Sequence, residues 1–383
     1  MSWPAWVLER GASPWFWIVI AVQGHLFTFY YSRIILHQTN PRSELLYGAP
    51  YVLLQAAAFA VFLHGWDFSG GILGLGPTYI ALWVFLCLGA SAGLLLRHLG
   101  WMVGVRRKVR FRPLRTRILS QGYQPPLQAL QKLGLRNQLY DLQVRELELE
   151  LPNWPKEWSG LTVVHLTDLH HGRYIHDGYL AGVRAETLRL KPDLVVLTGD
   201  FVSTPGDFPK AFDWLKGLRA RMGVFAVLGN HEGWIDAPRA EKSLRKAGIR
   251  VLKNDGVRFQ RGRSSLALMG AEDLWTGERG LERLRNLRAD AKILLAHHPD
   301  HFFLARQLGA QLQLSGHCHG GQVCLPGGSA IVAPSRFGTR YASGFFREGP
   351  SIMFVNRGVG AYPPIRLFCP PEMVKLTLRP ETA

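Results

Sequence analysis

Residues 161–170, LTVVHLTDLH, contain the pattern on which the prediction of the fold rests. An apolar run passes directly into an acid and an imidazole, at Asp168 and His170. Four later apolar runs end in similar groups: DLVVLTG before Asp200, GVFAVLG before Asn230-His231-Glu232, AKILLA before His297-His298, and AQLQLSG before His317-Cys318-His319. In an open α/β sheet, functional sites form where the carboxyl ends of strands converge. Five such endings therefore predict one shared site.

The surrounding sequence has the pattern of an α/β layered domain. Residues 142–151, LQVRELELEL, alternate apolar and polar side chains and predict a half-buried strand, which a loop over 152–160 follows. Beyond that loop, short apolar runs alternate with amphipathic segments that predict helices over 178–190 and 208–220. This alternation predicts helices packed on sheets.

Five motifs occur in a fixed order: D-x-H at Asp168, GD at Asp200, GNH-[DE] at Asn230, a lone His at His297, and GH-x-H at His317. Together they resemble the calcineurin-like metallophosphoesterases, and no part of that pattern is missing. The resemblance covers residues 140–380. Its last part, YPPIR at 362–366 and PPEMVKLTL at 370–378, is similar to membrane-associated bacterial members. The resemblance implies a four-layer α/β/β/α sandwich over residues 140–383.

The resemblance also implies two divalent metal ions. Its ligand set is Asp168, His170, Asp200, Asn230, His297, His317 and His319. Asp200 is expected to bridge the ions, with Asp168, His170 and His319 on one and the remaining three ligands on the other. Two metal ions about 3.5–4 Å apart can clamp the attacking and the leaving oxygen of an in-line displacement at phosphorus. The mixed nitrogen and oxygen ligands favour manganese, with iron, zinc or cobalt as alternatives, over calcium.

The expected catalytic residues are His231 and Asp200. His231 is not a ligand in the family pattern, and we expect it to protonate the leaving oxygen or stabilise its charge. Glu232 is expected to fix the loop or to hydrogen-bond near a ligand. The family pattern prefers His297 over His298 as the ligand.

In extended backbone, residues i and i+2 point the same way, so His317 and His319 face the metals together and Cys318 turns away. A structural zinc site around Cys318 is the alternative. By the same argument His171 points away from Asp168 and His170.

Three arginines follow the metal motifs: Arg336, Arg340 and Arg357. We expect surface or structural roles for them, with contact to the substrate phosphate as the alternative.

Residues 1–100 are predicted to be a membrane region. Three apolar segments, at 14–36, 45–63 and 77–96, each approach the ~20 residues that a helix needs to cross the bilayer. Whether 14–36 crosses or lies on the membrane stays open, and a buried helical domain is the alternative. The expected location is the inner (plasma) membrane, with several spans.

Residues 101–139 are predicted to be a basic linker beside the membrane. The formal charge of the chain is +17, yet seven basic residues and no acidic one gather in 101–117, directly after the last apolar segment. This position fits the positive-inside rule better than nucleic-acid binding, and no nucleic-acid partner is expected. The catalytic domain is therefore expected to face the cytoplasm. Residues 122–135 are predicted to form a short amphipathic helix, either on the membrane or solvated.

The expected substrate is a phosphodiester or pyrophosphate. Residues 199–204, GDFVST, lack the GD-x-VDRG motif of the protein phosphatases of this superfamily, and Leu228 replaces their Arg before GNH. A lipid-linked substrate such as UDP-2,3-diacylglucosamine fits the membrane region, because some related enzymes cleave its pyrophosphate. The alternatives are a soluble-nucleotide phosphodiesterase or phosphatase, and a non-catalytic membrane sensor or scaffold.

Overall fold

The computed structural model describes residues 109–119, 122–277 and 282–382. The three apolar segments predicted to cross the membrane lie outside these residues. Among the helices in the described ranges, none is both long and apolar enough to span a bilayer.

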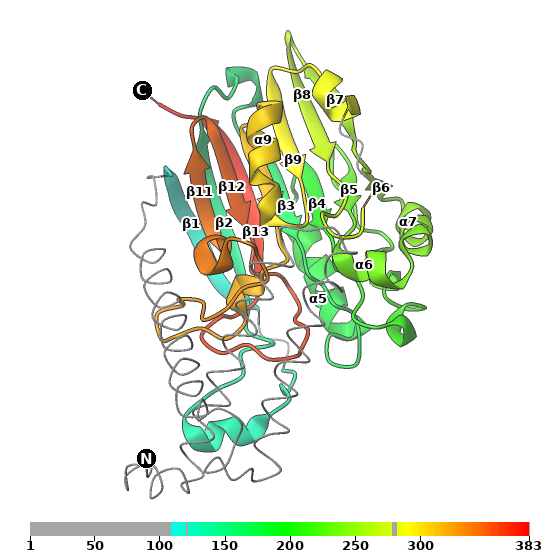
Figure 1. The fold of residues 1–383 in the computed structure, drawn as a ribbon, viewed down its shortest axis with the longest axis vertical. Coiled ribbons are helices and arrows are strands. Elements are labelled where there is room, and N and C mark those ends of the chain that lie inside the picture. The colour runs from blue at the N-terminus through cyan, green and yellow to red at the C-terminus, as the bar shows by residue number, and fades with distance from the viewer. Residues whose placement is uncertain (1–108, 120–121, 278–281, 383) are drawn as a thin grey trace, which may run out of the picture. The chain divides into compact units, whose positions relative to one another are not determined.

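Two mixed sheets form the domain (Figure 1). The first has the order β1 (Phe111–Leu119), β2 (Leu142–Leu151), β13 (Glu372–Pro380), β3 (Leu161–Leu166), β4 (Leu194–Thr198), β5 (Val224–Val227) and β6 (Arg250–Val251). The second has the order β11 (Gly344–Glu348), β12 (Ser351–Val355), β10 (Leu312–Ser315), β9 (Ala291–Leu295), β8 (Ser264–Gly270) and β7 (Asp255–Arg261).

In each sheet, four neighbouring strands are parallel, and the candidate site lies at their carboxyl ends. In the first sheet β3, β4, β5 and β6 pair in parallel, and in the second β8, β9, β10 and β12 do so. Parallel strands place their carboxyl ends along the same edge of a sheet. The five apolar runs of the sequence are β3, β4, β5, β9 and β10, so their polar endings lie on two such edges.

Four layers result from the alternation of side chains along the strands. In β3, Leu161 and Val163 pack between the sheets, whereas Val164 and Leu166 pack on the opposite face. The outer face of the first sheet is covered by α5 (Asp177–Arg189) and α7 (Ala237–Lys246). The outer face of the second sheet is covered by α9 (Phe302–Leu308) and α8 (Glu282–Asn286). The expected order of helix, sheet, sheet and helix is confirmed for the described domain.

The predicted helix over 178–190 is confirmed as α5, but the predicted helix over 208–220 is wrong. That segment contains a short 3-10 turn, Asp213–Leu215, instead of an α-helix. Phe208, Phe212 and Leu215 are buried at helix-like spacing, which explains the prediction. The backbone forms i to i−3 hydrogen bonds there, such as Ala211 N–H to the Phe208 carbonyl oxygen, and Gly217 ends the turns with a φ of 82°.

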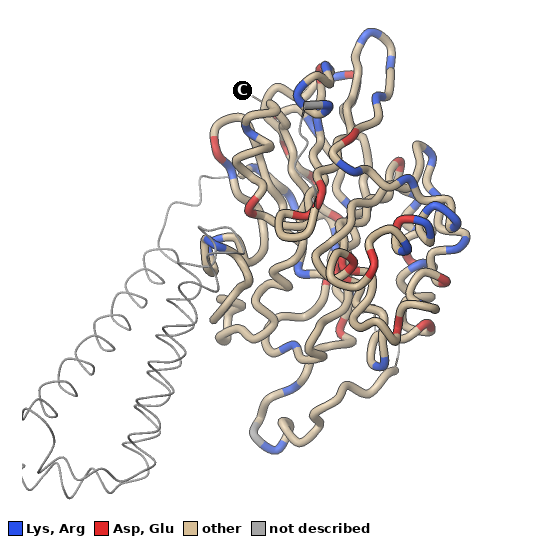
Figure 2. The backbone as a smooth tube through the Cα atoms, turned by 45° about the vertical axis from the view of Figure 1, so that its right-hand side comes forward, with Lys and Arg blue, Asp and Glu red and all other residues tan. Residues whose placement is uncertain are grey.

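The sheet begins before residue 140, within the range predicted to be a linker. Strand β1 pairs antiparallel with β2, from Phe111 opposite Leu149 to Leu119 opposite Leu142. Within 122–135, the predicted amphipathic helix is only the 3-10 helix Gln128–Leu133. Lys and Arg are dispersed among Asp and Glu over the visible part of this domain (Figure 2).

Candidate metal centre

The structure brings all seven predicted ligands together at the carboxyl edges of the two sheets. Asp168 and His170 follow β3, Asp200 follows β4, and Asn230 begins α6 (Asn230–Ile235) directly after β5. From the second sheet, His297 follows β9, and the pair His317 and His319 follows β10. All seven side chains are buried.

One group of ligand atoms belongs to Asp168, His170, Asp200 and His319, and these atoms lie within 4.8 Å of one another. His170 Nε2 lies 3.1 Å from His319 Nε2 and 3.6 Å from Asp200 Oδ2. His319 Nε2 lies 3.3 Å from Asp168 Oδ1. This is the set that the sequence assigned to one of the two ions.

A second group surrounds His297. Its Nε2 lies 3.1 Å from Asn230 Oδ1 and 3.2 Å from His317 Nδ1. The same nitrogen lies 3.2 Å from Asp200 Oδ2. One carboxylate oxygen of Asp200 therefore faces both groups, which is the position that a bridging ligand needs.

The donor set fits two divalent cations. Ring nitrogens of His170 and His319 face each other at 3.1 Å, and those of His317 and His297 at 3.2 Å, all beside carboxylates. Burying carboxylates is costly without strong partners. Imidazole nitrogens and carboxylate oxygens are ligands that Mn, Fe, Zn and Co share. Divalent cations would take the place of the protons between these nitrogens and oxygens, with all seven residues as ligands.

The electrostatics of the protein alone reflect this crowding. Burial and the neighbouring Asp200 raise the pKa of Asp168 to about 7. Burial lowers the pKa of His170 to about 3. Burial also opposes protonation of His297, but Asp200 and Asp168 raise its pKa to about 10. Asp168 and His297 therefore bind a proton more tightly than usual, whereas His170 binds one less tightly.

The ligands are fixed by groups behind them. His297 Nδ1 donates to the carbonyl oxygen of Thr198 at 2.6 Å, which leaves Nε2 as the ring nitrogen directed at Asn230 and Asp200. The Asp168 carboxylate accepts from the Thr167 hydroxyl and from the backbone N–H of His317. These contacts orient both side chains before any ion binds.

Glu232 is confirmed as the residue that fixes the loop. Its carboxylate accepts backbone N–H groups of Asp200, Phe201, Val202 and Gly229, at 2.7 to 3.2 Å. It therefore holds the chain on both sides of Asp200.

The backbone around the ligands is not extended, so that part of the sequence argument is wrong. Asp168, His170, Asp200, His317 and His319 all have a φ between 48° and 67°. This left-handed conformation is costly for residues with a side chain and is typical of functional sites. The two histidines still reach the same centre, and Cys318 packs into the core of the second sheet.

His298 lies closer to the centre than the sequence indicated. Its ring is 3.7 Å from that of His317, and its atoms group with those of His297 and His317. His298 Nε2 also lies 2.9 Å from Asp273 Oδ2. Sequence reasoning missed Asp273, although the run SSLALMG of β8 passes into Glu272 and Asp273 in the same way as the other five runs.

His231 stands beside the first group of ligands. Its half-buried ring lies 4.7 Å from that of His170, and its Nδ1 is 3.3 Å from the Ser203 carbonyl oxygen. Its backbone N–H donates to Asp200 Oδ1 at 3.1 Å. The ring is thus placed next to the predicted ligands without belonging to either group.

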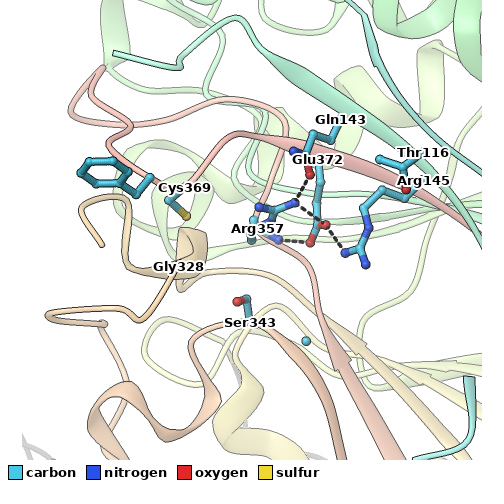
Figure 3. Close-up of a pocket in the computed structure, with 10 residues that line it drawn as sticks. Thr116, Gln143, Arg145, Gly328, Ser343, Arg357, Cys369 and Glu372 are labelled. Atoms are coloured by element: carbon cyan, nitrogen blue, oxygen red, sulfur yellow. Dashed lines mark hydrogen bonds and ion pairs between the residues drawn. The ribbon is translucent and has the colours of Figure 1, made fainter. Parts of the chain in front are cut away.

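The contacts of the three arginines lie away from the centre. Arg336 covers the rings of Phe303 and Phe337, and Arg340 pairs with Glu348. Arg357 points into a separate pocket of about 420 Å³, which Figure 3 shows.

In that pocket Arg357 and Arg145 pair with the buried Glu372, and Arg357 also donates to Gln143. These contacts favour the structural role expected for Arg357.

Comparisons with known proteins agree with this geometry. Residues 161–321 match the family described as calcineurin-like phosphoesterase. The metallophosphoesterase YkuE of Bacillus subtilis is 30% identical, over 59% of this chain and 81% of its own length. Phosphodiesterase YaeI of Escherichia coli is 31% identical, over 56% and 81%. UDP-2,3-diacylglucosamine pyrophosphatase LpxG of Chlamydia muridarum is 24% identical, over 61% and 88%.

Proposed function

The chain belongs to the calcineurin-like phosphoesterase family of metal-dependent phosphoester hydrolases, and from this premise we propose that it is a membrane-anchored hydrolase of phosphodiester or pyrophosphate bonds. The observation that carries the proposal is the convergence of all seven predicted ligands on two groups joined by Asp200. A scaffold that had lost catalysis would be expected to lack a ligand, and every ligand is present.

Each residue has a defined role in this proposal. Asp168, His170 and His319 would hold one divalent ion, Asn230, His297 and His317 would hold the other, and Asp200 would contact both. When bound, the ions supply a nucleophile at neutral pH and stabilise charge on the phosphoryl oxygens. Manganese is the proposed metal.

His231 is the proposed general acid. Its ring is half-buried, 4.7 Å from the ring of His170, and belongs to neither ligand group. The backbone N–H of His231 donates to Asp200, so the loop that carries the ring is tied to the bridging carboxylate. The ring can then donate a proton to the leaving oxygen as the ester bond breaks.

The proposed substrate is lipid-linked, in the manner of UDP-2,3-diacylglucosamine. Two findings support it: the similarity to LpxG, whose name gives that pyrophosphate as its substrate, and three apolar segments before residue 100. A membrane anchor raises the local concentration of a lipid-borne ester at the catalytic domain.

A soluble-nucleotide phosphodiesterase is the second candidate. Like the first candidate, it agrees with the similarity to YaeI, whose name gives phosphodiesterase activity and no substrate.

Purified full-length protein with Mn²⁺ distinguishes these functions. Its rates should be compared on a phosphomonoester, a phosphodiester and UDP-2,3-diacylglucosamine. We expect the diester and the nucleotide lipid to be cleaved, with the higher kcat/KM on the lipid. Equal kcat/KM values on a water-soluble nucleotide diester would favour the second candidate, and no hydrolysis of any substrate would contradict both.

The proposed location is the inner (plasma) membrane, with the catalytic domain in the cytoplasm. The support is the basic cluster at 101–117 and the lack of Lys and Arg in 64–76. Reporter fusions after residue 120 and at the C-terminus test this side. Activity of a reporter that works only outside the cytoplasm, at both junctions, would reverse the assignment.

A further inference from the structure

Three large aromatic side chains are exposed at the mouth of the metal centre. Trp234 on α6 is 60% exposed, Trp275 in the loop after β8 is 40% exposed, and Tyr362 in the loop between β12 and β13 is 48% exposed. They come from three segments far apart in the sequence. We call them the aromatic rim.

Each ring of the aromatic rim contacts a histidine of the centre. The Trp234 ring lies 5.3 Å from that of His231, and the Tyr362 ring lies 5.7 Å from it. On the side of the second ligand group, the Trp275 ring lies 4.8 Å from that of His317. The rim therefore borders both ligand groups and the proposed general acid.

The two indoles of the aromatic rim stack on each other. The rings of Trp234 and Trp275 are tilted by only 19° with centroids 6.0 Å apart, which is an offset stack. The Tyr362 ring is tilted by 27° from the His170 ring, and the two ring centroids are 6.1 Å apart. Flat ring faces are thus presented beside the position where a phosphorus would be held.

Single exposed apolar side chains are normal on proteins, but a cluster of them is a mark of ligand contact. Trp234 keeps more than half of its surface in contact with water, so burial in the core does not account for it. The cluster lies directly around a site whose ligands are otherwise buried, which assigns it to the substrate.

We propose that the aromatic rim binds the nucleobase of a nucleotide-bearing phosphoester, by stacking of the base on Trp234 and Trp275. The inference rests on the proposed function and names the class of ester that the same centre takes. Aromatic faces stack on any base. One sugar ring separates a base from its 5′-phosphate, and the rim rings lie 4.8 to 6.1 Å from histidines of the centre.

Two synthetic diesters with the same leaving group test the proposal: thymidine 5′-(4-nitrophenyl phosphate) and methyl 4-nitrophenyl phosphate. With full-length protein and Mn²⁺, we expect a kcat/KM at least about tenfold higher for the thymidine ester. Trp234→Ala and Trp275→Ala should each remove most of this ratio, mainly through KM for the thymidine ester. Trp234→Phe should retain most of the ratio, because a smaller aromatic face remains.

Phe303→Ala is the matched control, because Phe303 is 42% exposed and contacts Arg336, away from the ligands. It should leave both kcat/KM values unchanged. Hydrolysis of both esters at equal kcat/KM, or an equal loss for both in Trp234→Ala, would overturn the nucleobase assignment and leave the proposed function standing. A preference for octyl 4-nitrophenyl phosphate that Trp234→Ala removes would assign the rim to an alkyl chain instead. Hydrolysis of no ester would contradict the proposed function and this inference with it.

Discussion

Two clusters of buried charge lie in this domain, and they are satisfied in opposite ways. Glu372 accepts a hydrogen bond from Arg145 at 2.8 Å, one from the Arg357 side chain at 3.0 Å and one from the Arg357 backbone N–H at 2.9 Å. Figure 3 shows these groups pointing at one another. In the metal centre, Asp200 instead faces the ring nitrogens of His170 and His297, which themselves face other ring nitrogens.

The difference separates a structural cluster from a binding site. Opposite charges that donate and accept in matched pairs are complete within the protein. Ring nitrogens that converge on one another need a proton or a metal ion between them, and metal binding replaces those protons. A substitution in the first cluster should therefore cost stability, and one in the second should cost metal and activity.

The largest effect is expected for Asp200→Ala. Removal of the shared carboxylate should release both ions and lower kcat by ~10³-fold or more, since bound metal supplies several kcal/mol of transition-state stabilisation. Metal analysis and kinetics on the same preparation check this. Full activity with one tightly held ion in the variant would contradict the two-group arrangement.

His231→Ala should keep both ions and lower the rate by ~10²–10⁴-fold, the usual range for a general acid. The loss should shrink for a substrate with a good leaving group, such as 4-nitrophenol, because that oxygen needs little protonation. A Brønsted series of leaving groups measures this dependence. An equal loss across the series would show that His231 acts in another way, and Cys318→Ser is the control that should remain active.

Glu372→Gln tests whether the first cluster contributes to stability alone. Burial raises the pKa of Glu372, but Arg357 and Arg145 lower it by more, to about 2, which is below the ordinary value of 4.5. The variant should lose about 3 kcal/mol of unfolding free energy at neutral pH while it keeps its metals. Denaturant unfolding and metal analysis of the full chain provide the two readouts.

The pH dependence of that loss follows from the sign of the shift. Above pH 4.5 the carboxylate is ionised in both the folded and the unfolded chain, and its full contribution is present. As the pH falls from 4.5 toward 2, the unfolded chain binds the proton first and the contribution of Glu372 disappears. The stability difference between wild type and variant should therefore narrow between pH 5 and pH 3. A constant difference would show that the ion pairs are not its source.

His298→Ala should have a smaller effect than His297→Ala. His297 contacts Asn230 and Asp200 directly, whereas His298 pairs with Asp273 and packs on the His317 ring. We expect about tenfold weaker metal binding in His298→Ala, the lower end for a group that supports a ligand. Titration of metal into chelator-treated protein measures it. A larger loss than in His297→Ala would exchange the roles of the two histidines.

The sequence predicted the strands and their polar ends well, because period-two alternation and short apolar runs depend on local burial. β2 has the predicted bounds, 142–151, and the residues of all five motifs meet. It failed at 208–220, where 3-10 turns that end at Gly217 bury the same apolar residues that a helix would bury.

Contacts between distant segments carried no local signal. Strand β1 joins the sheet by pairing with β2, and its exposed, basic residues favoured a linker in the sequence. Trp234, Trp275 and Tyr362 become neighbours of the centre only through the fold.

The metal content of the purified full chain tests the central claim most directly. Protein loaded with Mn²⁺ and freed of excess metal should hold two ions per chain, and electron paramagnetic resonance should detect magnetic coupling between them through Asp200. One ion per chain, or two ions without coupling, would contradict the claim that a single carboxylate joins two ligand groups.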